Sequence, residues 1–215
     1  MKKLFLFILI AGLAGFAGLT SFPSVGHARA AGPYIGGGYQ QPLMFSWKSQ
    51  SSFAPNPGSK LSFWPGFGMY IVGGYEFDKP DWFGLAMPVS WSLIKVNKAE
   101  WAHMINVDAE AIFHFMEPDQ KLDPYVAALA GFNYMTEGKT NNGSKSLGPD
   151  FGAAFGLKYT ILEYAKAGSP GVTNLSFHAE VPVKIILFIN DEELSPSKTT
   201  PVIAVPVRFG LTYSF

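Results

Sequence analysis

From residue 201 to residue 215, apolar side chains alternate with small or polar ones. The apolar set is Ile203, Val205, Val207, Phe209, Leu211, Tyr213 and Phe215, and between them lie Ala204, Pro206, Arg208, Gly210, Thr212 and Ser214. Successive side chains of a β-strand point to opposite faces of the sheet. The segment is therefore predicted to be a strand with one apolar face and one small or polar face.

The same alternation recurs along most of the chain. It covers residues 67–77, 83–93, 101–115, 150–161 and 175–187, while 34–40 and 125–135 are placed as strands by their spacing. Most of these segments are about as long as the roughly 9–11 residues that a tilted strand needs to cross a bilayer. An even number of strands closes an antiparallel sheet without exposed edges. We predict an all-β fold, a transmembrane antiparallel up-and-down β-barrel of about eight strands.

Three prolines qualify this prediction. Pro88, Pro182 and Pro206 fall on the polar face, and each removes one backbone donor from the ladder. We expect bulges or bends at these positions.

The two faces of such a barrel must next be assigned to lipid and lumen. A lipocalin has the same strand number with its apolar face inside, around a ligand. Here the small and charged residues share one face, which suits the narrow interior of an eight-stranded barrel. The connections 41–65, 136–148 and 190–200 are longer than 78–81 and 117–123, as expected for extracellular loops and periplasmic turns, although 96–99 is short and 163–172 is long. We therefore expect the large apolar side chains to face lipid.

The first thirty residues have the pattern of a secretory signal peptide. Lys2 and Lys3 precede an apolar run from 4 to 19, and Ala28-Arg29-Ala30 matches the small-x-small cleavage pattern. A retained membrane anchor is the alternative. We expect residues 1–30 to be cleaved and 31–215 to form one barrel domain in the cell outer membrane of a Gram-negative bacterium.

Composition excludes several kinds of site. Sixteen basic residues balance sixteen acidic ones without forming a basic patch, so nucleic-acid binding is not expected. The chain has no cysteine, which excludes disulfides and thiolate sites. His103 and His114 lack the spacing of a metal pair, and 191–193 is expected to be a solvated acidic loop, so no metal or cofactor is predicted.

The charged residues of the inward face are expected to neutralise one another. We predict a polar network in the lumen composed of Asp108, Glu110, Lys158, His178, Glu180, Lys184 and Arg208. Register places Lys158, Glu180 and Arg208 on neighbouring strands, and Asp108 and Glu110 would complete the network from across the lumen. Pairing of this kind offsets the large cost of burying isolated charges.

One spacing on this face superficially suggests catalysis. Ser176, His178 and Glu180 could supply a nucleophile, a base and an orienting group. However, alternate residues of a strand lie nearly 7 Å apart, so a direct bond between serine and histidine is not assured. We interpret the three residues as part of the polar lining.

The two ends of the mature chain resemble known outer-membrane proteins. Arg208, Gly210, Tyr213 and Phe215 match the carboxy-terminal assembly signal of bacterial outer-membrane barrels, and 34–39 resembles the first strand of OmpA-, OmpX- and OmpW-type small barrels. The resemblance implies insertion by the barrel assembly machinery. It also implies contact with outer-membrane lipid and lipopolysaccharide, and we expect a monomer.

These features favour a non-catalytic outer-membrane protein with a structural or surface-interaction role. The first alternative is a porin-like narrow channel or a binding barrel for small, apolar solutes. The second is a lipid A deacylase or acyltransferase, which the position of His178 in the periplasmic half of its strand disfavours. The long first loop contains the aromatic residues Phe45, Trp47, Phe53, Phe63 and Trp64. It is the candidate for contacting a partner or an apolar solute, and packing over the barrel mouth is the alternative.

Overall fold

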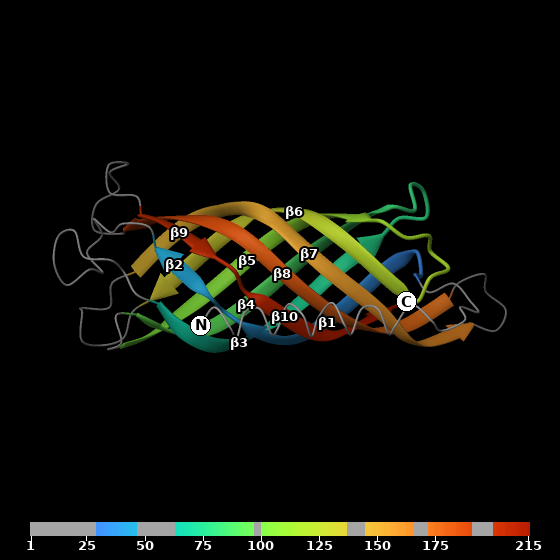
Figure 1. Cartoon of the computed structure of the whole chain (residues 1–215), viewed down its shortest axis with the longest axis horizontal. Helices are drawn as coiled ribbons and strands as arrows, with labels where there is room; N and C mark the ends of the chain where they lie inside the picture. The colour runs from blue at the N-terminus through green and yellow to red at the C-terminus, as the bar shows by residue number, and fades with distance from the viewer. Residues whose placement is uncertain (1–28, 47–62, 97–99, 137–144, 166–171, 191–199) are drawn as a thin grey trace, which may run out of the picture.

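The strands form one closed antiparallel sheet in a computed structural model that describes residues 29–46, 63–96, 100–136, 145–165, 172–190 and 200–215 (Figure 1). The strands are β1 (Gly32–Gln41), β2 (Met44–Ser46), β3 (Phe63–Glu76), β4 (Phe83–Val96), β5 (Glu100–His114), β6 (Leu122–Thr136), β7 (Lys145–Ala165), β8 (Val172–Asn190), β9 (Thr200–Ala204) and β10 (Val207–Ser214). In the described part of the chain, no helix has the length and apolar character needed to span a membrane.

The ten strands form the wall of an eight-stranded barrel. β2 continues the line of β1, and β9 continues into β10, so each of these two pairs counts as one strand of the wall. β10 pairs with both β1 and β8, which closes the sheet. The predicted fold class is confirmed.

Most of the observed strands are longer than the sequence pattern indicated, but the single strand predicted for 201–215 is divided at Val205 and Pro206 into β9 and β10. β7 runs from Lys145 to Ala165, whereas alternation marked only 150–161. At the strand ends both faces are polar or mixed, so alternation stops there while the backbone ladder continues. Hydrophobic pattern therefore marks the middle of each strand better than its limits.

The prolines interrupt hydrogen bonding without shifting the register. Glu180 pairs with Arg208 and Lys184 pairs with Ala204, so Pro182 lies opposite Pro206 in an unpaired gap. Pro88 keeps its pairing position opposite Val72 of β3, and the register between β4 and β5 is the same on both sides of it. The predicted bulges are absent at these prolines, because proline lacks a donor but keeps an extended backbone. The register shifts occur elsewhere, between 64 and 67 and between 160 and 162.

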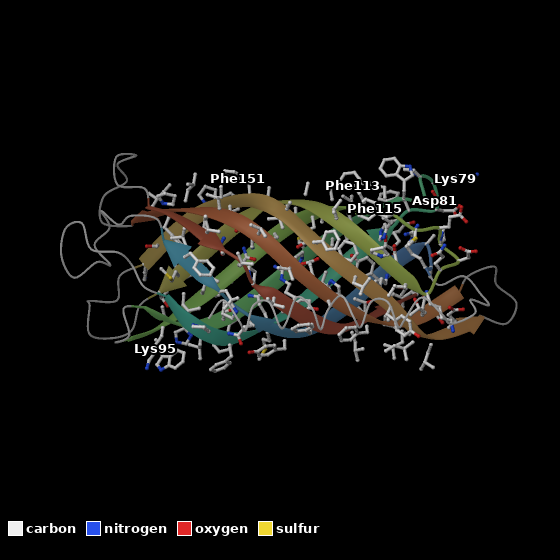
Figure 2. The ribbon with its side chains drawn as sticks, in the orientation of Figure 1. Lys79, Asp81, Lys95, Phe113, Phe115 and Phe151 are labelled. Atoms are coloured by element: carbon white, nitrogen blue, oxygen red, sulfur yellow. The ribbon has the colours of Figure 1, made fainter. Side chains whose placement is uncertain are left out.

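The apolar face lies outside and the charged face lies inside. Ile71 and Phe155 are 65% and 62% exposed, whereas Arg208 and Glu180 are 1% and 2% exposed. Figure 2 shows Phe115 and Phe151 projecting from the outer wall. This assignment confirms the expected faces and rules out a lipocalin-like interior.

The two ends of the barrel differ. The connections 77–82 and 115–121 lie at the same end as the carboxy terminus, where Lys79 and Asp81 are seen in Figure 2, and we call this the turn end. At the other end, near Lys95, strands β2, β4, β6 and β8 end, and we call it the loop end. Strand β8 rises from the turn end to the loop end, so its inward residues 176, 178, 180, 184, 186 and 188 mark successive depths in the lumen.

Candidate functional site

Arg208 lies at the centre of the lumen and bonds to three other strands. Its guanidinium donates to Glu110 Oε1 and Glu180 Oε1, both at 2.8 Å, and to Asp108 Oδ2 at 3.0 Å. Its Nε donates to Gln40 Oε1 at 3.0 Å. A planar guanidinium with several fixed donors suits such a convergence of carboxylates. We call these five residues the central ion group.

A lysine extends this group towards the loop end. Lys184 Nζ lies 2.7 Å from Asp108 Oδ2 and 2.8 Å from Asn106 Oδ1. It also lies 3.6 Å from Asp150 Oδ2, which accepts hydrogen bonds from Asn106 and Asn133. Asp108 therefore accepts from both cations and links β5, β8 and β10 across the lumen.

A second charged group lies nearer the turn end. His114 Nε2 is 2.8 Å from Glu76 Oε2, and its Nδ1 is 2.8 Å from Asp123 Oδ2. Lys158 Nζ is 3.5 Å from Glu76 Oε1, and Arg29 is 3.2 Å from Asp123. All five are buried, and we call them the turn-end group.

A layer of tyrosines around His178 separates the two charged groups. Tyr70 Oη lies 3.1 Å from His178 Nδ1, and Tyr125 Oη lies 2.5 Å from His178 Nε2. Tyr125 also donates to Glu180 Oε2 at 2.9 Å. A consistent proton arrangement has Nε2–H donating to Tyr125 and Nδ1 accepting from Tyr70.

The serine, histidine and glutamate of β8 do not form a catalytic relay. The Ser176 hydroxyl lies 3.2 Å from Thr160 Oγ1. Both ring nitrogens of His178 are occupied by tyrosine hydroxyls. The histidine therefore has no nitrogen left to activate the serine.

The loop end of the lumen is apolar instead of charged. Its buried side chains are Met44, Ile94, Ala102, Met104, Met135, Ile186, Phe188, Val202 and Ala204. We call this set the apolar plug. It lies above Lys184 on the rising course of β8 and fills the barrel where the longer connections begin.

Two small cavities lie in the lumen formed by the described strands. One of about 30 Å³ lies between the tyrosine layer and the turn-end group, and one of about 10 Å³ lies beneath the apolar plug. The first holds at most a water or two, and it is bordered by Thr212, whose hydroxyl has no hydrogen-bond partner among the described residues. Neither cavity admits a larger solute.

The structure distributes the predicted network residues over several layers. Asp108, Glu110, Glu180 and Arg208 meet in one group, with Lys184 beside it. Lys158 lies opposite His178 in register, but its amino group reaches Glu76 and not the predicted Glu180. Strand tilt and side-chain length, as well as register, decide which carboxylate the lysine reaches, and Glu180 is bound instead by Arg208 and Tyr125.

The predicted network left out several residues that line the lumen. They are Arg29, Gln40, Glu76, Asn106, His114, Asp123, Asn133 and Asp150, together with Tyr34, Tyr70 and Tyr125. Most of them occupy inward positions of their strands, so alternation could have identified them as lumen residues. Their partners come from distant strands and required the register.

The remaining candidates lie away from the lumen or outside the described residues. His103 is exposed on the outer wall, with its ring 5.8 Å from that of Trp91. Within the described ranges, no cluster of histidine and carboxylate side chains has the geometry of a metal site. Phe45 lies in β2, and Phe63 and Trp64 lie in β3, so these three residues belong to strands and not to the predicted first loop, because backbone pairing extends past the alternating segments. Trp47, Phe53 and 191–193 lie outside the described residues.

Comparison with known proteins identifies the fold. No protein-family model and no curated protein sequence matches the chain. Among solved structures it is similar to Neisserial surface protein A, with 20% identity, a TM-score of 0.57, and coverage of 86% of this chain and 99% of that one. It is also similar to the outer membrane protein OprG from Pseudomonas aeruginosa, with 15% identity, a TM-score of 0.50, and coverage of 89% and 99%. The chain therefore has the fold of the small eight-stranded outer-membrane β-barrels.

Proposed function

We propose that the protein resides in the outer membrane of a Gram-negative bacterium and acts there without catalysis, as a closed barrel with a structural or surface-interaction role. The observation that carries this proposal is the central ion group. Arg208 joins carboxylates from β5 and β8 across the full width of the lumen. A barrel whose strands are joined by ion pairs across the lumen is suited to a structural role and not to passing solutes.

The outer wall supports membrane insertion. Its middle presents apolar side chains such as Ile71, Met87 and Val183, which are 65%, 58% and 51% exposed. In water this surface would be far larger than the apolar patches that soluble monomers tolerate. In a bilayer the same surface is the required lipid contact.

Aromatic side chains gather at both ends of this apolar belt. At the turn end, the rings of Tyr75, Phe77, Trp82, Phe83 and Phe113 contact one another in sequence. At the loop end, Phe67 contacts Trp91 and Trp101, and Lys95 lies 5.5 Å from the Trp101 ring centre. Two such girdles mark the membrane–water interfaces in outer-membrane barrels.

Single-channel recording tests the closed lumen. The purified protein, reconstituted in a planar bilayer, is expected to give no more current than the protein-free bilayer, because the two cavities between the described strands have room for water molecules only. The heat-denatured protein added at the same concentration is the control. Regular unitary conductance steps would contradict the closed-barrel proposal and favour the porin-like alternative.

The lack of catalysis can be tested separately. His178 is 8% exposed, points into the lumen and is held by two tyrosines, so it does not reach a lipid on the outer wall. Expression of the protein in a Gram-negative host should leave the mass of lipid A unchanged. A changed lipid A mass that reverts in His178→Ala would establish the enzyme alternative.

One observation favours a second candidate function, the binding of a small apolar solute at the loop end. The apolar plug contains Met44, Met104 and Met135, and methionine side chains repack readily around other apolar groups. Added n-octanol should then shift the methyl resonances of these methionines in nuclear magnetic resonance spectra. Met69 and Met87, which face lipid, are the controls, and shifts no larger than theirs would remove this candidate.

Assembly is proposed to depend on the last residues of the chain. Tyr213 and Phe215 are exposed on the outer wall, where an assembly factor could reach them, while Arg208 points inward. We expect Phe215→Ala to reduce the yield of folded barrel in cells while leaving refolding into detergent intact. Equal losses in both settings would show that Phe215 acts only in stability.

A further inference from the structure

Arg29 is buried at the turn end of the lumen, although the sequence pattern placed it within the cleaved signal peptide. We propose that signal peptidase cleaves after Ala28, so that Arg29 is the first residue of the mature protein and its side chain closes the turn end of the barrel. The proposal rests on export to the outer membrane, as proposed above. It moves the start of the mature chain two residues upstream of the expected Ala31.

The contacts of Arg29 are those of an integral part of the barrel. Its side chain is paired with Asp123 at 3.2 Å and donates to the backbone carbonyl of Asp81. Its backbone nitrogen, which becomes the terminal ammonium after cleavage, donates to the carbonyl of Pro118 at 2.8 Å. Arg29 is 7% exposed and the next residue, Ala30, is 4% exposed. The arginine thereby joins the segment 77–82 to the segment 115–121 at the turn end.

The electrostatics of the turn-end group depend on this arginine. The group holds two carboxylates, Glu76 and Asp123, with His114 between them. Lys158 forms an ion pair with Glu76, and Arg29 forms an ion pair with Asp123. Without Arg29, the buried Asp123 would keep only the histidine as a charged neighbour, and a carboxylate buried without adequate partners is strongly unfavourable.

The sequence permits cleavage at either position. The small-x-small pattern occurs twice in overlap, as Gly26-His27-Ala28 and as Ala28-Arg29-Ala30. Cleavage after Ala30 removes Arg29, whereas cleavage after Ala28 keeps it. The pattern alone does not choose between the two cleavage sites, but the buried ion pair of Arg29 favours cleavage after Ala28.

Amino-terminal sequencing of the protein purified from the outer membrane of a Gram-negative host tests the proposal directly. The expected sequence begins Arg-Ala-Ala-Gly-Pro, and the intact mass corresponds to residues 29–215. A chain that begins at Ala31, lighter by one arginine and one alanine, overturns the proposal but leaves export intact. A chain that keeps its first residues would instead contradict export itself.

Processing of substituted precursors gives an independent result. If cleavage occurs after Ala28, Ala30 is the second residue of the mature protein. If cleavage occurs after Ala30, Ala30 is the last residue of the signal peptide. Pulse–chase labelling should therefore show that Ala30→Leu is processed at the wild-type rate. Ala28→Leu, which disturbs both patterns, is the control and should accumulate as precursor. Accumulation of the Ala30→Leu precursor would overturn the proposal.

The structural role of the arginine is tested in the mature protein. Arg29→Gln should lower the urea midpoint of unfolding in detergent micelles, whereas Lys79→Gln, an exposed charge at the same end, should leave it unchanged. The loss should shrink in a background that also carries Asp123→Asn, because the unpaired charge is then gone. Sequencing of each variant verifies its start. A midpoint for Arg29→Gln equal to that of Lys79→Gln would show that the arginine does not close the barrel.

Discussion

The substitution Arg208→Gln removes the cation at the centre of the lumen and leaves a shorter, uncharged polar side chain. In the wild-type protein the guanidinium donates to Glu110, Glu180 and Asp108. Asp108 keeps Lys184 at 2.7 Å, but the two glutamates lose their cation. The variant therefore leaves two neighbouring carboxyl groups in a closed interior with too few partners.

The cost can be bounded from general values. Removing one partner of a buried ion pair destabilises a protein by about 3–5 kcal/mol. Holding one carboxyl group protonated at neutral pH costs roughly 4 kcal/mol, which limits the penalty because the variant can take up a proton. We therefore expect a loss of about 4 kcal/mol, which corresponds to a fall of roughly 2 M in the urea midpoint at an m-value of about 2 kcal/mol/M.

The assay is urea unfolding in lipid vesicles, followed by tryptophan fluorescence. The double variant Arg208→Gln/Glu110→Gln should recover part of the loss, because one of the two unpaired carboxylates is removed. Lys79→Gln, an exposed charge outside the lumen, is the matched control and should unfold like the wild type. If Arg208→Gln unfolds at the same urea concentration as Lys79→Gln, the central ion group does not hold the barrel together.

Two further substitutions probe the lumen. A Cβ at Gly156 would overlap the ring of Tyr125, so Gly156→Ala should displace that ring and cost about 1–3 kcal/mol in urea unfolding, whereas Gly73→Ala, with open space around it, should cost nothing. If both variants lose stability, or if neither does, the packing of the tyrosine layer is unimportant. Glu76→Gln weakens contacts with a buried histidine and a buried lysine, and should lower stability by about 2 kcal/mol relative to the exposed control Glu117→Gln. An equal midpoint for these two variants would contradict the assigned ion pairs.

The fold could be predicted from the sequence because two-residue alternation is a local property. Every predicted segment contains strand structure, although 201–215 is divided into two strands, and this holds even for 34–40, which has three consecutive glycines. Glycine at 38 is needed there because a Cβ would collide with the carbonyl of Phe209 on the neighbouring strand. Strand limits and proline effects were predicted less well, since backbone pairing continues where side-chain patterning stops.

The pairing of charges in the lumen could be predicted only in part. Alternation and register together brought Glu180 beside Arg208, and Asp108 and Glu110 were expected across the lumen. Lys158 bonds to Glu76 instead of Glu180, because contacts across a narrow lumen depend on strand tilt and side-chain length as well as on register. These quantities are not local to any segment of the sequence.

Side chains at every second position of a strand face lipid, and the side chains between them face a closed lumen. The natural chain has no cysteine, so single cysteines can be placed along β8 from 177 to 185 and labelled with a nitroxide in lipid vesicles. Electron paramagnetic resonance should show high oxygen accessibility at 177, 179, 181, 183 and 185 and low accessibility at the positions between them. A water-soluble nickel chelate, used as a second relaxation agent, should reach neither the odd-numbered nor the even-numbered positions in the middle of the strand. Reversed alternation, or chelate access at Val183, would contradict the account.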